Sequence, residues 1–96
     1  MFSDTTEQGA RWLVSGRVQG VGFRWHVLRE AQRLGVTGDV RNLPDGRVEI
    51  RAKGMPRDLD LLLEAVRDGP ALARIDEIVA RDLDANVAFE SFGVRS

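Results

Sequence analysis

The residues with the most distinctive spacing in this chain lie in the stretch Gly16–His26, which reads GRVQGVGFRWH. It places three glycines within seven residues and then an arginine, where an apolar strand is expected to give way to a helix. Glycines at such a junction let successive backbone N–H groups point toward one ligand, and the N-terminus of a helix attracts negative charge. Arg24 adds a planar guanidinium that can bind two phosphate oxygens. The stretch therefore indicates a site for a phosphate-like anion.

The common phosphate-binding motifs do not match this stretch. A dinucleotide-binding motif that starts at Gly20 would need a third glycine where Trp25 stands, and the chain has no Gly-Lys pair for a P-loop. The loop of cysteine phosphatases, in which an arginine follows a cysteine after a short spacer, resembles this stretch most. Here, however, Val18 occupies the cysteine position. A tight strand-to-helix turn beside a surface arginine is the alternative interpretation of the same residues.

The flanking sequence predicts the elements that would hold this loop. Alternation of apolar and polar residues indicates strands, and apolar residues three and four apart indicate helices. Gly35 and Gly69-Pro70 stand where helices are expected to end, and Pro44-Asp45-Gly46 is typical of a turn. The predicted elements are, in chain order, a strand from Arg11, a helix from Phe23, strands over 36–43 and 47–53, a helix over 59–66, and strands over 75–81 and 89–95.

This order predicts an α+β fold of the ferredoxin-like βαββαβ type, a sandwich of a mostly antiparallel sheet with two helices on one face, plus a short C-terminal strand. A right-handed crossover places the third strand between the first two, which then run parallel to each other. Their C-terminal ends lie at the same edge of the sheet, so the glycine loop and Asn42 are expected to be neighbours. We expect a flexible N-terminal segment over residues 1–9 and a single domain over residues 10–96.

The composition is ordinary for a globular protein, with 43% hydrophobic and 30% charged residues and a net charge of -1. Nucleic-acid-binding proteins usually carry an excess of positive charge, so no nucleic-acid partner is expected. The absence of cysteine excludes disulfides, thiolate metal sites and a thiol nucleophile. No apolar run approaches the length that crosses a membrane. We therefore expect a cytoplasmic monomer that needs no metal or other cofactor.

Two blocks of the chain resemble the signatures of the acylphosphatase family, in its common type: VQGVGFR at 18–24 and GDVRNLPDGRVE at 38–49. Residues 69–71 and 92–95 resemble the family more loosely, and the likeness covers nearly the whole chain after Gly9. It implies an enzyme, an acylphosphatase, which hydrolyses a small-molecule acyl phosphate to a carboxylate and inorganic phosphate. Inorganic phosphate or sulfate is expected to bind at the same site. Asp39 departs from the family, which commonly has an aromatic residue there.

The resemblance implies two catalytic residues: Arg24, which binds the substrate phosphate, and Asn42, which positions the attacking water. The residues expected to bind the phosphate are Gln19, Gly20, Val21, Gly22, Phe23 and Arg24. The reaction needs no general acid, because carboxylic acids have a pKa of about 4 and the carboxylate leaves unprotonated at neutral pH. The predicted topology also places Arg17, Arg41 and Arg47 near this edge of the sheet. These arginines either attract the substrate by their charge or are merely solvated residues at strand ends.

Two other functions stay open at this point: a non-catalytic acylphosphatase-like module that binds an anion or phosphate, and a ferredoxin-like RNA-binding module. An RNA-binding sheet would display aromatic side chains on its third strand, and residues 47–53 include none. We expect His26 to be solvated and Asp58-Leu59-Asp60 to supply charge to a helix N-terminus. Trp12 and Trp25 are expected to pack in the core or at its rim rather than to bind a ligand.

Overall fold

The computed structural model of this chain describes residues 6–96, and their five strands and two helices follow the predicted order. The elements are β1 (Gln8–Arg17), α1 (Phe23–Leu34), β2 (Thr37–Asn42), β3 (Val48–Gly54), α2 (Pro56–Asp68), β4 (Arg74–Arg81) and β5 (Phe92–Val94). β1 begins at Gln8, within the segment expected to be flexible, and residues 1–5 of that segment lie outside the described residues. The final strand is shorter than the predicted 89–95.

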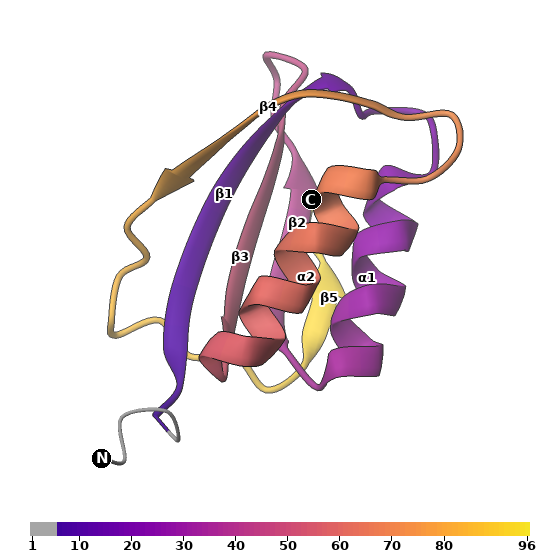
Figure 1. The fold of residues 1–96 in the computed structure, drawn as a ribbon. Coiled ribbons are helices and arrows are strands. Elements are labelled where there is room, and N and C mark those ends of the chain that lie inside the picture. The colour runs from indigo at the N-terminus through magenta and orange to yellow at the C-terminus, as the bar shows by residue number, and fades with distance from the viewer. Residues whose placement is uncertain (1–5) are drawn as a thin grey trace.

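The strands form one sheet in the order β4-β1-β3-β2-β5, and both helices lie on the same face of it (Figure 1). β3 runs antiparallel to β1 and to β2, β1 runs antiparallel to β4, and β2 and β5 are parallel. β1 and β2 therefore point the same way with β3 between them, as a right-handed crossover requires. The mostly antiparallel βαββαβ fold is confirmed, with β5 added at the edge beside β2.

Both helices are amphipathic, and their apolar sides close the core over the sheet. The buried helical residues are Phe23, Val27 and Ala31 in α1 and Leu59, Leu62 and Val66 in α2. Pro56, whose fixed φ suits the first turn of a helix, begins α2. Gly35 and Gly69 follow the last helical residues, as predicted, and their N–H groups donate back to carbonyls of the final turns.

β3 separates the core from a polar face, because successive side chains of a strand point to opposite sides. Its core residues are Val48, Ile50 and Ala52, and all three are completely buried. The residues between them, Glu49, Arg51 and Lys53, point to the face away from the helices. The predicted alternation of β3 is confirmed.

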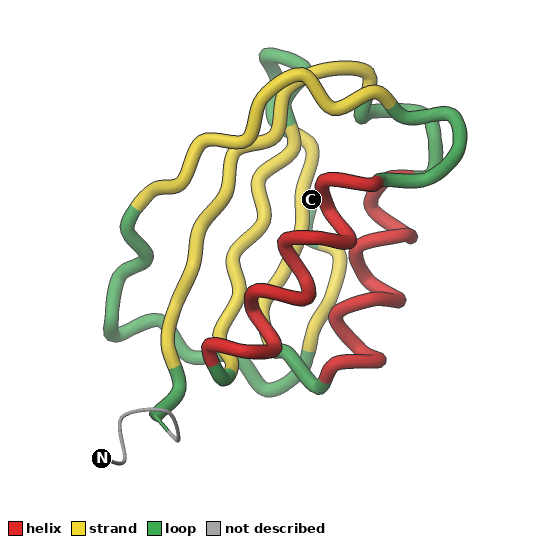
Figure 2. Tube along the Cα trace, in the orientation of Figure 1, coloured by secondary structure: helices red, strands yellow, loops and turns green. Residues whose placement is uncertain are grey.

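The connection between β4 and β5, residues 82–91, crosses this polar face, because β4 and β5 are the two edge strands of the sheet (Figure 2). The ammonium group of Lys53 donates to the backbone carbonyls of Ala85 and Val87. The guanidinium of Arg51 lies 5.2 Å from the centre of the Phe89 ring. Polar side chains of β3 thus hold the connection, and Phe89 belongs to it rather than to β5.

Glu49 is buried on the polar face, with only 3% of its surface exposed, and three arginines hold its carboxylate. Oε2 accepts a hydrogen bond from Nε of Arg11, and Oε1 accepts from Nε of Arg41 and Nη2 of Arg95, each at 2.8 Å. Burial raises the pKa of this carboxyl, but the hydrogen bonds from Arg11 and Arg41 lower the pKa by more, so it lies below its usual value. The carboxylate joins β1, β2 and the residue after β5.

We expect Glu49→Gln to lower the free energy of unfolding at pH 7 by about 3 kcal/mol, because removing one partner of a buried ion pair leaves the other charges uncompensated. The folded-state pKa of Glu49 is depressed, so its stabilisation is present above the unfolded pKa of about 4.3 and is lost as the pH falls through the folded-state pKa. Urea denaturation at pH 7 and at pH 3 should show the difference between wild type and variant shrinking in acid.

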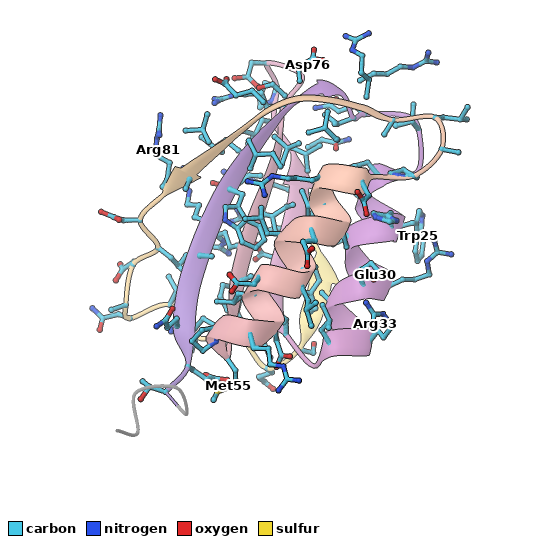
Figure 3. All side chains as sticks on the ribbon, in the orientation of Figure 1. Trp25, Glu30, Arg33, Met55, Asp76 and Arg81 are labelled. Carbon is cyan, nitrogen blue, oxygen red and sulfur yellow. The ribbon has the colours of Figure 1, made fainter. Side chains whose placement is uncertain are left out.

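Glu30→Gln is the matched control, since Glu30 pairs with Arg33 on the outer side of α1, where Arg33 is well exposed (Figure 3). Exposed pairs of this kind contribute about 0.2–1 kcal/mol. A Glu49→Gln effect that is as small as this, or that keeps its full size at pH 3, would contradict the role assigned to the carboxylate.

Candidate active site

The loop between β1 and α1, residues 18–22, has the backbone geometry of an anion-binding site. Gly20 and Gly22 adopt left-handed conformations, with φ of +74° and +82°. In the described part of the chain only glycines have positive φ, so Gln19 and Val21 have negative φ. The sign of φ therefore alternates from residue to residue, as it does in the anion-binding nests whose successive N–H groups point to one side.

The backbone N–H groups of residues 19–24 donate to no other atom of residues 6–96. The first hydrogen bond of α1 runs from N–H of His26 to the carbonyl of Gly22, at 3.1 Å. Gly22 is the N-cap, and no side chain caps the helix. These donors are available to a ligand, and the helix dipole favours a negative one.

Arg24 stands in the first turn of α1, and that turn holds no acidic residue. A cation there is unfavourable by about 0.3–1 kcal/mol, because the N-terminal end of a helix carries partial positive charge. Arg24 is exposed and has no ion-pair partner within residues 6–96, whereas Arg41 pairs with Glu49 and Arg47 with Asp45. An anion between Arg24 and the loop N–H groups would offset this repulsion.

The side chain of Gln19 joins the loop to the hairpin between β2 and β3. Its Nε2 donates to the carbonyl oxygens of Leu43 and Arg47, at 2.9 Å each. Leu43 directly follows Asn42, so the loop lies beside the end of β2, as predicted, and Figure 2 shows both connections at the same end of the sheet. The amide of Gln19 is thus occupied, and only its backbone N–H is left for the predicted contact with phosphate.

Apolar side chains anchor the loop to the core on both sides. Val18 and Phe23 are almost completely buried, and Val21 packs partly buried against the same cluster. Val21 and Phe23 can therefore offer only backbone groups to a phosphate. Among the residues predicted to bind phosphate, Arg24 alone has a charged side chain, and Arg17 lies exposed just before the loop, at the end of β1.

Asn42 ends β2 with an unsatisfied amide oxygen. Its Oδ1 is buried and has no hydrogen-bond partner within residues 6–96. A buried acceptor without a donor costs about 1–3 kcal/mol, so native proteins rarely leave one without a role. Strand alternation places Asn42 on the same side of the sheet as Val40, which is core, and opposite Arg41. A hydrogen-bond acceptor without a partner among residues 6–96 therefore lies at the end of β2.

The structure corrects two expectations about the helix that carries Arg24. His26 is not merely solvated, because its Nε2 lies 2.8 Å from the carbonyl oxygen of Ala65 and so joins α1 to α2. Trp12 is buried as predicted, but Trp25 is 68% exposed on the outer side of α1 (Figure 3) and lines a pocket together with Arg24. Helical spacing could not show either feature, since both depend on neighbours from other elements.

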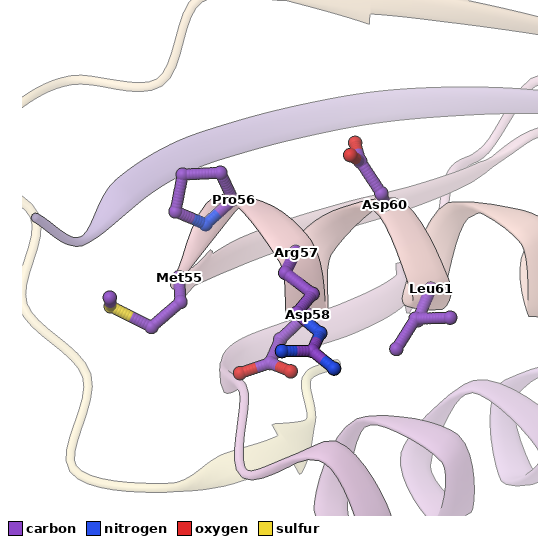
Figure 4. A pocket seen from close by; sticks show the side chains of 6 residues that line it. All are labelled: Met55, Pro56, Arg57, Asp58, Asp60 and Leu61. Carbon is purple, nitrogen blue, oxygen red and sulfur yellow. The ribbon is translucent and has the colours of Figure 1, made fainter. Parts of the chain in front are cut away.

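A larger pocket lies at the N-terminal end of α2, far from the glycine loop (Figures 1 and 4). It is lined by Met55, Pro56, Arg57, Asp58, Asp60 and Leu61. Asp58 belongs to the first turn of α2, which agrees with its predicted role as helix charge. Over residues 6–96, no group of three or more His, Cys, Asp or Glu side chains could hold a metal ion. Over the same span, no helix is long and apolar enough to cross a membrane.

Comparison with known proteins identifies a family from both the sequence and the structure. A model of the acylphosphatase family matches residues 10–94. The acylphosphatase of Marinobacter nauticus is 51% identical over 84 residues, which cover 85% of this chain and 91% of the relative. The acylphosphatase of Salinibacter ruber is 48% identical over 90 residues, which cover 94% of this chain and 95% of the relative. The crystal structure of the Bacillus subtilis acylphosphatase aligns with a TM-score of 0.88 at 35% identity, over 95% of this chain and all of the other.

We expect Gly22→Ala to lower the free energy of unfolding by about 1 kcal/mol or more, because an L-residue is strained at a φ of +82°. A Cβ at this position meets no atom within 4 Å, so the loss would report backbone strain rather than a clash. Gly93→Ala is the control: a Cβ there also meets nothing within 4 Å, and its φ is outside the left-handed range. Equal losses in both variants, measured by urea denaturation, would refute the conformational explanation.

Proposed function

This chain belongs to the acylphosphatase family and hydrolyses acyl phosphates to a carboxylate and inorganic phosphate, and we propose that the 19–24 loop and Asn42 together form its active site. The observation that carries this proposal is the side-chain amide of Gln19, which brings the free loop N–H groups beside the end of β2. An anion-binding loop and an unsatisfied acceptor thus belong to one site.

The loop binds the phosphoryl group of the substrate. Backbone N–H groups of residues 19–24 donate to its oxygens, and the helix dipole favours its charge. The guanidinium of Arg24 donates two parallel hydrogen bonds to two phosphate oxygens. Because the fold fixes the backbone donors before the substrate arrives, they stabilise the charge on the transferring group without reorganisation during the reaction.

Asn42 positions the nucleophile. A water donates one hydrogen bond to Oδ1 of Asn42, and its oxygen attacks phosphorus. The new P–O bond forms as the bond from phosphorus to the acyl oxygen breaks, and that electron pair leaves with the carboxylate. The proton of the water passes to a phosphate oxygen. No protein base or acid takes part in this step. His26, two residues after Arg24, is not needed as a base, and its Nε2 is hydrogen-bonded to a backbone carbonyl of α2.

The remaining expectations belong to the same proposal: a cytoplasmic monomer that acts on a small molecule and binds no nucleic acid. The polar face of the sheet supports the last point. An RNA-binding sheet needs an open face with aromatic side chains, whereas here β3 presents Glu49, Arg51 and Lys53, and residues 82–91 cross over them. The alternative of a phosphate-binding module without activity is separated from the enzyme by the assay below.

We expect the purified protein to hydrolyse benzoyl phosphate with undiminished rate in EDTA and with competitive inhibition by inorganic phosphate, since the loop recognises the phosphoryl group. In water enriched in oxygen-18 the label should enter phosphate and not benzoate, because water attacks phosphorus. Mass spectrometry of both products checks this. Label in benzoate would refute the attack at phosphorus, and phosphate binding without hydrolysis would favour the non-catalytic alternative.

The two side chains should have separable kinetic roles. Arg24→Ala should raise KM and lower kcat, because the guanidinium contacts the phosphate in both the ground state and the transition state. Arg24→Lys should recover little, since an ammonium cannot form the paired contact. Asn42→Ala should lower kcat by about 10²–10³-fold with little change in KM, because the alignment of the water matters most during attack. Steady-state kinetics on benzoyl phosphate measures all three.

Arg57→Ala is the control for loss of one positive charge, since Arg57 lies exposed at the far end of α2, and it should behave as the wild type. Asn42→Ala should leave the unfolding midpoint unchanged or higher, because it removes a buried oxygen without a partner. Near-normal turnover in Asn42→Ala, or activity lost only together with the fold, would contradict the assignment.

A further inference from the structure

A pocket beside the proposed phosphate site combines one cation with apolar surface. It is lined by Arg24, Trp25, Leu28 and Val94. Trp25 is 68% exposed and Val94 is 46% exposed, while Leu28 packs partly buried against the core. None of the four is acidic, so the pocket suits a ligand that is apolar at one end and anionic at the other.

The fold brings these residues together from two elements. Trp25 and Leu28 are three residues apart on α1 and so share one helix face. Val94 ends β5, the edge strand beside β2, and it pairs with Val40 in the parallel ladder. Figure 3 shows the indole of Trp25 on the outer side of α1, away from the core. Most of the apolar surface of this side chain is therefore outside the core, where a ligand can contact it.

Arg24 connects this pocket to the chemistry. The proposed function assigns the guanidinium of Arg24 to the phosphoryl group, and Arg24 is also one of the residues that line the pocket. In an acyl phosphate only the bridging oxygen and the carbonyl carbon separate phosphorus from the organic group. An organic group attached to a phosphoryl that Arg24 binds therefore lies within reach of Trp25.

We propose that Trp25, Leu28 and Val94 form the acyl-binding surface of this enzyme and make it favour acyl phosphates with an aromatic or bulky apolar acyl group over acetyl phosphate; the inference rests on the proposed function. The indole face stacks on the acyl group, and Leu28 and Val94 contact its edges. Trp25 acts as a specificity-determining residue, because an acetyl group is too small to cover the indole.

The test compares benzoyl phosphate with acetyl phosphate in wild type and Trp25→Ala. We expect Trp25→Ala to lower kcat/KM for benzoyl phosphate about tenfold, the order of magnitude of one aromatic stacking contact, and to change kcat/KM for acetyl phosphate less than about twofold. Trp25→Phe should keep most of the preference. Leu61→Ala is the matched control, since Leu61 is 41% exposed and lines the separate pocket on α2.

A binding measurement removes the chemical step. In the methylene phosphonate analogues of the two substrates a CH2 group replaces the bridging oxygen, so they bind without reacting. Competitive inhibition constants should show the benzoyl analogue weakened about tenfold by Trp25→Ala and the acetyl analogue unaffected. Selective loss for the benzoyl compounds in both measurements supports the inference.

The outcomes separate the inference from the function on which it rests. Equal effects of Trp25→Ala on both substrates, or no effect on either, would overturn the acyl-binding surface while leaving the enzyme's activity and the Arg24–Asn42 site intact. A loss of the same size in Leu61→Ala would also overturn it. Failure of the wild type to hydrolyse either compound would instead overturn the proposed function, and the inference with it.

Discussion

The arrangement of the site depends on the amide of Gln19 and its two hydrogen bonds to the carbonyls of Leu43 and Arg47. The loop and the hairpin are separate connections at one end of the sheet, and their backbones have no strand pairing with each other. An amide NH2 can donate to two carbonyls at once, which a carboxylate or a hydroxyl cannot do. The loop of residues 18–22 is therefore joined to the end of β2 by one side chain, to which the proposed mechanism assigns no step.

The opposite face of the sheet contributes to the same site. Arg41 precedes Asn42 in β2, and the pairing of Arg41 with Glu49 holds it on the face away from the helices. Since neighbouring residues of a strand point to opposite sides, this pairing directs the amide of Asn42 toward the helix side. The buried Glu49 cluster thus supports both the sheet and the orientation of a proposed catalytic side chain.

The chemistry explains why so small a domain is enough. Hydrolysis of an acyl phosphate has a leaving group that needs no protonation, so the protein must supply only charge stabilisation and an oriented water. In the proposed site, charge stabilisation comes from backbone N–H groups at a helix N-terminus and from Arg24. The backbone donors depend on glycine geometry rather than on a large pocket. The acyl group then meets the surface of α1 and β5, where Trp25 provides an aromatic contact that the phosphate site does not require.

The sequence alone determined the order of the elements and the position of the glycine loop, because the periodicity of apolar residues and the preference of glycine for turns are local properties. Apolar alternation and the crossover rule placed β3 between β1 and β2, and from this followed the proximity of the loop to Asn42. The two catalytic assignments came from resemblance to a family and stay predictions. Only the tertiary structure decided that Arg24 has no ion-pair partner within residues 6–96 whereas Arg41 and Arg47 have one. It also decided that Gln19 spans two connections, that Glu49 is buried and that Trp25 shares a pocket with Arg24. Each of these features depends on contacts between residues distant in sequence, and the spacing of residues within one element does not predict such contacts.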